Sequence, residues 1–301
     1  MTWITAALVV AALMAVVSVV DSHLISRRMP SFWTFLVPAG VIHFSFGLIF
    51  FVFHPPVSGV DAFPWFVAIV SAVARTAAAL LMLYAMRTEE ITRIIPVVYA
   101  HPVVVAILAV PLLGESLNYL QWLAIFMTVA GAVLISLKSW GQERGVRLRR
   151  SFVMLLASSL LFGVANVATK YASDYISFWN MYSITAICLG GVFCLLSMRP
   201  KVLRDLWGMT GRGTTLTLIA FNEIIALVGI VLSFWAIERG PVSLVSTVMG
   251  IRPFFVFLYA LVLSRSFPTV LDERFSPGIA ALKIASIALV VGGVAIINLV
   301  D

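Results

Sequence analysis

The chain has 301 residues, of which 62% are hydrophobic and only 11% are charged, and its formal net charge at pH 7 is +7. A soluble domain carries roughly a quarter charged residues, so this composition excludes a soluble globular protein and favours a polytopic membrane protein. Because nearly all of the chain lies in apolar runs, no separate soluble domain is expected, and the positive charge is interpreted as a topology signal and not as a nucleic-acid-binding surface.

Apolar runs separated by turns and charged residues predict ten transmembrane segments. Each is expected to be an α-helix, because backbone polar groups in a bilayer core have no water to bind. The predicted fold class is therefore an all-α integral membrane protein. In chain order, the segments cover approximately residues 3–26, 32–53, 63–86, 91–113, 119–138, 151–172, 177–198, 215–238, 242–264 and 278–299.

Basic residues gather in the loops that follow the first, third, fifth, seventh and ninth predicted segments. Because the cytoplasmic loops of membrane proteins carry the excess of Lys and Arg, these loops are expected in the cytoplasm and both termini outside. The loops hold 15 of the 20 Lys and Arg residues, namely Arg27, Arg28, Arg87, Arg93, Lys138, Arg144, Arg147, Arg149, Arg150, Arg199, Lys201, Arg204, Arg212, Arg265 and Arg274.

The two halves of the chain resemble each other. A shift of 151 residues aligns residues 84–113 with 235–264 without a gap and pairs Pro102 with Pro253, and the tripeptide "SFW" recurs at positions 31 and 177. These matches predict two five-helix repeats, residues 1–138 and 151–301, joined by a basic cytoplasmic linker, residues 139–150. Because each repeat has an odd number of segments, the repeats would be inverted relative to each other, as in many secondary transporters.

The stretch "PVVVAILAVPLLGESLNYLQWLAIFMTVAGAVLIS" (102–136) contains a mid-helix Pro102, a Leu-Gly-Glu sequence that ends at Glu115, a Gln-Trp pair that ends at Trp122, and Gly131. With ten segments in two repeats, it resembles the EamA branch of the drug/metabolite transporter superfamily. The resemblance implies a multi-pass transporter of the cytoplasmic (inner) membrane whose cavity lies partly between the third, fourth, eighth and ninth helices. It also implies cytoplasmic termini, opposite to the orientation that the basic residues predict. The second repeat departs from the pattern, with "LSRSFPTVLDERF" where Leu-Gly-Glu would recur.

Two ionisable residues, Arg75 and Glu223, lie in the middle of predicted segments. An ionisable side chain inside a membrane is costly, which makes both residues candidates for function. The shift of 151 places Glu223 at position 72, one helical turn from Arg75, so the two side chains are predicted to meet near the central axis. In the functional interpretation Arg75 holds a substrate carboxylate or phosphate and Glu223 binds an amine or a proton. The alternative is a permanent structural ion pair.

The pairs His101-Pro102 and Arg252-Pro253 occupy matching positions in the fourth and ninth segments. Proline removes a backbone donor and disfavours helical geometry in the preceding residue, so both helices are expected to be interrupted there. His101 and Arg252 are then predicted to point inward as substrate-binding residues. The alternatives are a packing histidine and an arginine that extends to the membrane surface.

Weaker candidates complete the predicted site. Aromatic residues at segment ends have an alternative role as membrane-interface anchors. His43 is interpreted as a structural histidine, and Asp21 and Asn166 as residues near the mouths of the pathway. The remaining candidates for substrate binding are Asn222, Tyr84, Tyr99 and Trp235.

Together these patterns predict a secondary active transporter of a small anionic or zwitterionic metabolite that works by alternating access, with a proton as the candidate coupling ion. The alternatives are an exporter of lipophilic cations, a flippase for a lipid-linked carrier, and a non-transporting sensor or assembly subunit. Enzyme, metal and cofactor signatures do not occur in the sequence, so no catalytic residue, metal or cofactor is expected. The expected partners are the substrate and membrane lipids, with no nucleic acid, and the chain is expected to be a monomer or homodimer. Substrate identity and the direction of transport stay open.

Overall fold

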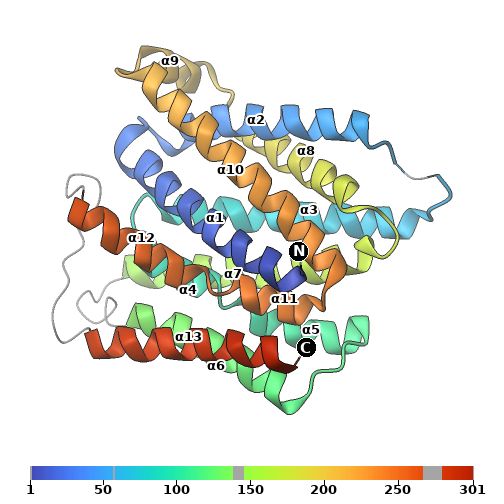
Figure 1. Ribbon diagram of the computed structural model, residues 1–301. Helices are drawn as coiled ribbons and strands as arrows, with labels where there is room; N and C mark the ends of the chain where they lie inside the picture. The colour runs from blue at the N-terminus through green and yellow to red at the C-terminus, as the bar shows by residue number, and fades with distance from the viewer. Residues whose placement is uncertain (1, 57, 138–145, 267–279, 301) are drawn as a thin grey trace.

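The computed structural model describes residues 2–56, 58–137, 146–266 and 280–300, and these residues form helices and short connections without strands. The N- and C-terminal ends lie at the same end of the helix bundle (Figure 1). The helices are α1 (Trp3–His23), the π-helical turn η1 (Leu24–Arg28), α2 (Phe32–Phe53), α3 (Ala62–Ala85), α4 (Ile91–Val98), α5 (His101–Leu113), α6 (Tyr119–Leu137), α7 (Val146–Ser173), α8 (Phe178–Ser197), α9 (Pro200–Gly208), α10 (Arg212–Arg239), α11 (Val242–Met249), α12 (Arg252–Ser266) and α13 (Ala280–Val300).

Eight stretches of the described residues are long and apolar enough to cross a membrane. They match the first four predicted segments and the sixth to ninth, and each boundary agrees to within a few residues. In α6 and α13 the described apolar stretches are shorter, Tyr119–Gly131 and Ala288–Leu299. Most of the predicted linker and of the loop near 265–277 lies outside the described residues. The eight stretches are Trp3–Arg28, Phe32–Phe53, Ala62–Ala85, Ile91–Leu113, Ser151–Ser173, Phe178–Ser197, Arg212–Arg239 and Val242–Leu263.

Helix α9 was not predicted, because its nine residues fall in a loop that the sequence assigns to the cytoplasm. It buries Val202 and Leu206 and leaves Trp207 exposed. Its outer face also carries the exposed Lys201 and Arg204. The amphipathic pattern suits a helix that lies at the membrane surface, where a basic face meets lipid headgroups.

The fourth and ninth segments are each two helices joined by a short interruption. Helix α4 ends at Val98 and α5 begins at His101; α11 ends at Met249 and α12 begins at Arg252. Both interruptions fall immediately before a residue-proline pair, and their limits differ by the same 151 residues that align the sequence. Non-helical backbone at membrane depth is tolerated only where it is buried in protein or lines a cavity. The interruptions therefore mark the interior of the bundle as the place to look for a site.

Small residues allow the closest helix contacts. Helix α2 packs along α8, and α6 packs along α13 (Figure 1). A Cβ atom on Gly131 of α6 would lie 2.7 Å from the Ser286 carbonyl of α13, and one on Gly293 would lie 2.8 Å from the Ala124 carbonyl of α6. Both distances are too short for any side chain, so these glycines set the spacing of the two helices.

Glu115 connects the two halves of the chain at the end where the termini lie. Gly114 ends α5 in the left-handed conformation, at φ 68°, which a residue without a side chain adopts freely. The Glu115 carboxylate then accepts hydrogen bonds from the N–H groups of Val242 and Ser243 at 2.5 and 3.2 Å, and from the Ser243 hydroxyl at 2.5 Å. It caps the N-terminus of α11, where the unpaired N–H groups and the helix dipole favour a negative charge.

Candidate functional site

A cavity of about 140 Å³ lies where the two interrupted helices meet α1, α3, α7, α8 and α10. A cavity of on the order of 150 Å³ accommodates a molecule the size of benzene. Most of the wall is apolar, as ligand sites usually are, with a few polar groups that can fix orientation. Those polar groups are Arg75, Tyr99, His101, Asn166, Thr185, Ser233 and Arg252.

Arg252, the first residue of α12, is only 2% exposed. Its Nη1 donates to the Tyr99 hydroxyl and its Nη2 donates to the Ser18 hydroxyl of α1. The guanidinium also lies over the Tyr99 ring, 4.6 Å from the ring centre. Its Nε is buried without a hydrogen-bond partner in the described structure. Arg252 is therefore fixed in the interior by neutral groups, and the alternative of an arginine that reaches the surface is excluded.

Arg75 approaches the cavity from α3. Its Nη2 donates to Asn166 Oδ1 at 2.9 Å and to Thr169 Oγ1 at 3.2 Å, both on α7. The guanidinium lies 5.0 Å from the centre of the Phe234 ring, and its Nε is buried without a partner among the described residues. Asn166 in turn donates to Ser246 of α11 at 3.1 Å, which fixes the amide that receives Arg75.

Neither guanidinium has a carboxylate partner. Within the described ranges, no Asp or Glu oxygen lies within 4.0 Å of a nitrogen of Arg75 or Arg252. A buried cation without a counter-charge loses several kcal/mol of hydration that neutral partners restore only in part. The Thr185 hydroxyl, also on the cavity wall, is a third polar group without a hydrogen-bond partner in this part of the structure. The cavity therefore offers two positive charges and a free hydroxyl.

His101 borders the same cavity, but its Nδ1 is already hydrogen-bonded to the backbone. Its Nδ1 lies 3.1 Å from the Val98 carbonyl, which can only accept, so Nδ1 carries the hydrogen. The ring packs near Tyr99 and Phe162, with centroid distances of 5.4 and 6.1 Å. This carbonyl is one that the helix interruption leaves without its usual partner. His101 thus satisfies a carbonyl at the interruption, while Arg252, which the 151-residue shift aligns with it, presents a charge.

Glu223 does not meet Arg75, so the predicted central contact is not made. Its Oε2 lies 2.9 Å from Nε2 of His43 on α2. The neighbouring Asn222 donates from Nδ2 to Oδ1 of Asp21 on α1 at 2.7 Å. None of these side chains lines the cavity. His43 is consequently not an isolated packing histidine, and Asp21 is a buried residue, 7% exposed.

Tyr84 and Trp235 also lie away from the cavity. Tyr84 is 42% exposed and makes an edge-to-face contact with Phe32, with Arg87 above its ring. The Arg239 guanidinium lies over the Trp235 ring, 4.4 Å from the ring centre. Their positions fit the alternative role of interface anchors.

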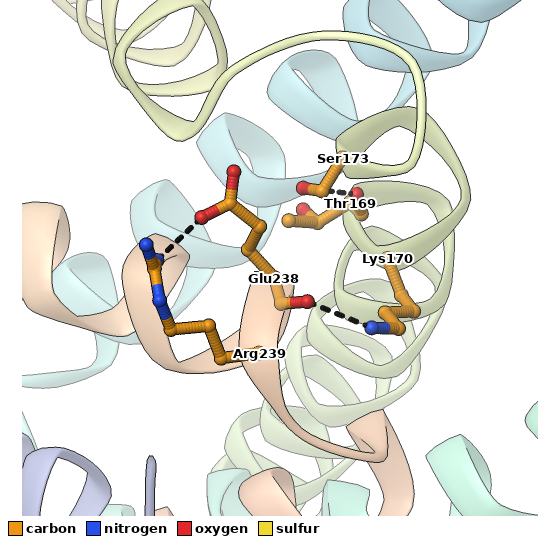
Figure 2. A network of polar contacts seen from close by, with 5 residues as sticks. All are labelled: Thr169, Lys170, Ser173, Glu238 and Arg239. Atoms are coloured by element: carbon orange, nitrogen blue, oxygen red, sulfur yellow. Dashed lines mark hydrogen bonds and ion pairs between the residues drawn. The ribbon is translucent and has the colours of Figure 1, made fainter. Parts of the chain in front are cut away.

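A polar network lies near Trp235, at the C-terminal end of α10. Figure 2 shows Lys170 donating to the Glu238 carbonyl at 3.0 Å and Arg239 bound to the Glu238 carboxylate at 2.5 Å. In the same view Ser173 donates to the Thr169 carbonyl at 2.8 Å. Lys170 therefore connects α7 to α10 through a backbone carbonyl group.

These features define a class: a multi-pass α-helical membrane protein with an internal, positively charged cavity where two interrupted helices meet. Residues 1–137 match the model of the EamA-like transporter family, which is part of the drug/metabolite transporter superfamily. The family resemblance predicted from the sequence is thereby confirmed.

Solved structures share the fold. One crystal structure, described only as that of a protein, is 18% identical over 96% of each chain, with a TM-score of 0.65. It is one of 25 chains that match. At this identity the likeness concerns the fold alone. Among curated proteins, none matches the chain significantly.

Proposed function

We propose that this chain is a secondary active transporter of the cytoplasmic membrane whose substrate is a small anionic or zwitterionic metabolite. The observation that carries the proposal is the pair of cavity arginines, Arg75 and Arg252, neither of which has a carboxylate partner in the described residues. A substrate carboxylate or phosphate would replace the missing counter-charge, and guanidinium groups bind both with two parallel hydrogen bonds. The cavity volume limits the substrate, or the part of it held there, to a few heavy atoms.

For the architecture we propose ten membrane spans in two inverted five-helix repeats that alternate access to this cavity. The packing supports a pseudo-two-fold relation, because exchanging each helix for its repeat counterpart exchanges the contact α3–α7 with α1–α10, and α5–α7 with α1–α12. A shift of 162 residues aligns 130–136 with 292–298, and the same shift exchanges the contact of Gly131 with Ser286 for that of Gly293 with Ala124. A cavity at the interface of inverted repeats is the usual place for a transported substrate.

The rival functions fit less well. A lipophilic cation would be repelled by two buried guanidiniums. A non-transporting sensor would be expected to pair its interior charges and to fill its centre, whereas here a cavity lies beside unpaired arginines. A flippase would need a lateral opening between helices for its lipid tail.

Ligand-induced stabilisation of the purified protein tests this proposal. Unfolding in detergent is followed while inorganic phosphate, monocarboxylates, amino acids and lipophilic cations are added one at a time. A ligand at 100 times its Kd adds about 2.7 kcal/mol of stability. We expect stabilisation by an anion or zwitterion that is lost in Arg75→Ala and kept in Arg239→Ala, because Arg239 lies on the surface. Stabilisation by cations alone, or anion binding that is equal in Arg75→Ala and the wild type, would overturn it.

A further inference from the structure

A second buried polar centre, here called the acidic centre, lies between α1, α2 and α10. It consists of Asp21, His43, Asn222 and Glu223, which are 7, 6, 1 and 5% exposed. Two carboxylates are thus more than nine-tenths buried, and neither has an arginine or lysine within 4.0 Å in the described part of the chain. Taking a carboxylate out of water is costly where no cation lies beside it.

One atom of the acidic centre lacks a partner. Asn222 donates from Nδ2 to Asp21 Oδ1 at 2.7 Å, but its own Oδ1 is buried and accepts no hydrogen bond from the described residues. An ionised Asp21 has no hydrogen to give. A protonated Asp21 has an O–H donor beside the same amide and would satisfy that acceptor. The amide therefore suits the protonated carboxyl better than the carboxylate.

Charged and titratable groups on the helices packed around α10 define the electrostatic surroundings of the acidic centre. From α1, Asp21 interacts electrostatically with Glu223, which disfavours two negative charges side by side. From α2, Nε2 of His43 lies 2.9 Å from Oε2 of Glu223. From α8, the hydroxyl of Tyr182 is buried without a hydrogen-bond partner among the described residues.

The remaining neighbours of α10 are distant or lack such groups. On η1, Arg27 and Arg28 are exposed, and Lys170 of α7 binds the Glu238 carbonyl at the other end of α10. Helix α11, "VSLVSTVM", has no titratable side chain. Around α1, which carries Asp21, the other charged or titratable groups are His23 on the same helix, Arg93 on α4, and Arg252 and Tyr259 on α12, and of these Arg252 acts electrostatically on Asp21.

Arg252 connects the acidic centre to the cavity. It acts electrostatically on Asp21 without forming an ion pair, and it donates to Ser18, which lies three residues before Asp21 on the same face of α1. The positive charge of Arg252 favours the Asp21 carboxylate. An anion bound at Arg252 would cancel part of that charge and so favour the protonated carboxyl.

We infer that the acidic centre is a proton-binding site, separate from the substrate cavity, that takes up a proton on Asp21 when an anion binds at Arg252. The proton comes from solvent and adds to a carboxylate oxygen, and the new O–H donates to Asn222 Oδ1. By thermodynamic reciprocity, the proton strengthens anion binding by the same factor. This coupling rests on the proposed function, whereas the proton site itself does not.

Infrared difference spectroscopy of the full-length protein in detergent tests the site without any substrate. Between pH 5 and pH 9 the wild type should show the C=O stretching band of a protonated, buried carboxyl group. Asp21→Asn should remove that band, while Asp174→Asn, at an exposed position, should leave it in place. Absence of the band in the wild type, or its survival in Asp21→Asn, would overturn the inference, as would stabilisation of the protein by Na⁺ in place of protons.

Proton uptake tests the coupling. A pH indicator in weakly buffered detergent solution reports uptake when phosphate, a monocarboxylate or an amino acid that stabilises the protein is added. We expect uptake in the wild type and none in Asp21→Asn, which should still bind the anion. Anion binding without proton uptake in the wild type would refute the coupling. If no anion binds at all, the proposed function fails, and the infrared result alone decides the proton site.

Discussion

The protein contains two buried polar centres of opposite character. The cavity holds two guanidiniums and no carboxylate, whereas the acidic centre holds two carboxylates and no guanidinium. A fold selected only for stability would pair these charges, because an unpaired buried charge is destabilising. Instead Arg252 is held by two hydroxyl groups and Asp21 by an amide. The separation leaves the fixed charges free for an external anion and the titratable groups free for a proton.

The largest expected effect belongs to Arg252, the one residue that serves both centres. Removing a buried, hydrogen-bonded partner of a charge typically costs 2–5 kcal/mol, so Arg252→Ala should weaken anion binding on the order of 100-fold or more. Arg252→Lys should restore part of the affinity, since an ammonium keeps the charge but not the planar pair of donors. Binding isotherms of the stabilising anion measure both, with Arg239→Ala as the surface control. Wild-type affinity in Arg252→Ala would remove the cavity arginines from the mechanism.

The next effect concerns the contact that replaces the predicted central pair, His43 with Glu223. Glu223→Ala leaves the buried His43 Nε2 without a partner, which should cost about 1–3 kcal/mol if the pair is neutral and 3–5 kcal/mol if it is ionised. Glu223→Gln keeps a hydrogen-bonding group and should cost less. The free energy of unfolding in mixed detergent distinguishes these cases, with Asp174→Asn as control. A Glu223→Ala variant as stable as the wild type would mean that the pair does not hold the acidic centre together.

The arginines of the cavity were largely predictable from the sequence, whereas the contacts within the acidic centre were not. Arg75 and Arg252 stand out because an ionisable residue in an apolar run has few inert explanations. The 151-residue shift also places the interruptions before His101 and Arg252, where the structure has them. These signals are local or periodic, so they can be recognised in the sequence without knowing how the helices pack.

The partners, in contrast, depend on which face each helix turns to its neighbours. The shift puts Glu223 one turn from the Arg75 equivalent, yet α10 directs it to His43 of α2, 180 residues away in the chain. An apolar helix such as α2 has almost no hydrophobic asymmetry that would reveal its inner face. Ser18 and Thr185 carry no signal either, because small hydroxyl residues are common in membrane helices. Glu115 was visible in its Leu-Gly-Glu sequence, but its contact with α11 was not.

The smallest expected effect is at His101, and it tests whether titration belongs to the acidic centre alone. His101 borders the cavity, but its Nδ1 is committed to the Val98 carbonyl and its ring to aromatic neighbours. His101→Phe keeps the ring packing and removes one hydrogen bond, so anion affinity should change less than about tenfold, or 1.4 kcal/mol. Proton uptake on anion binding should persist in this variant and vanish in Asp21→Asn. If His101→Phe abolished uptake while Asp21→Asn kept it, the titrating group would lie in the cavity itself. The two centres would then not divide fixed charge and exchangeable proton between them.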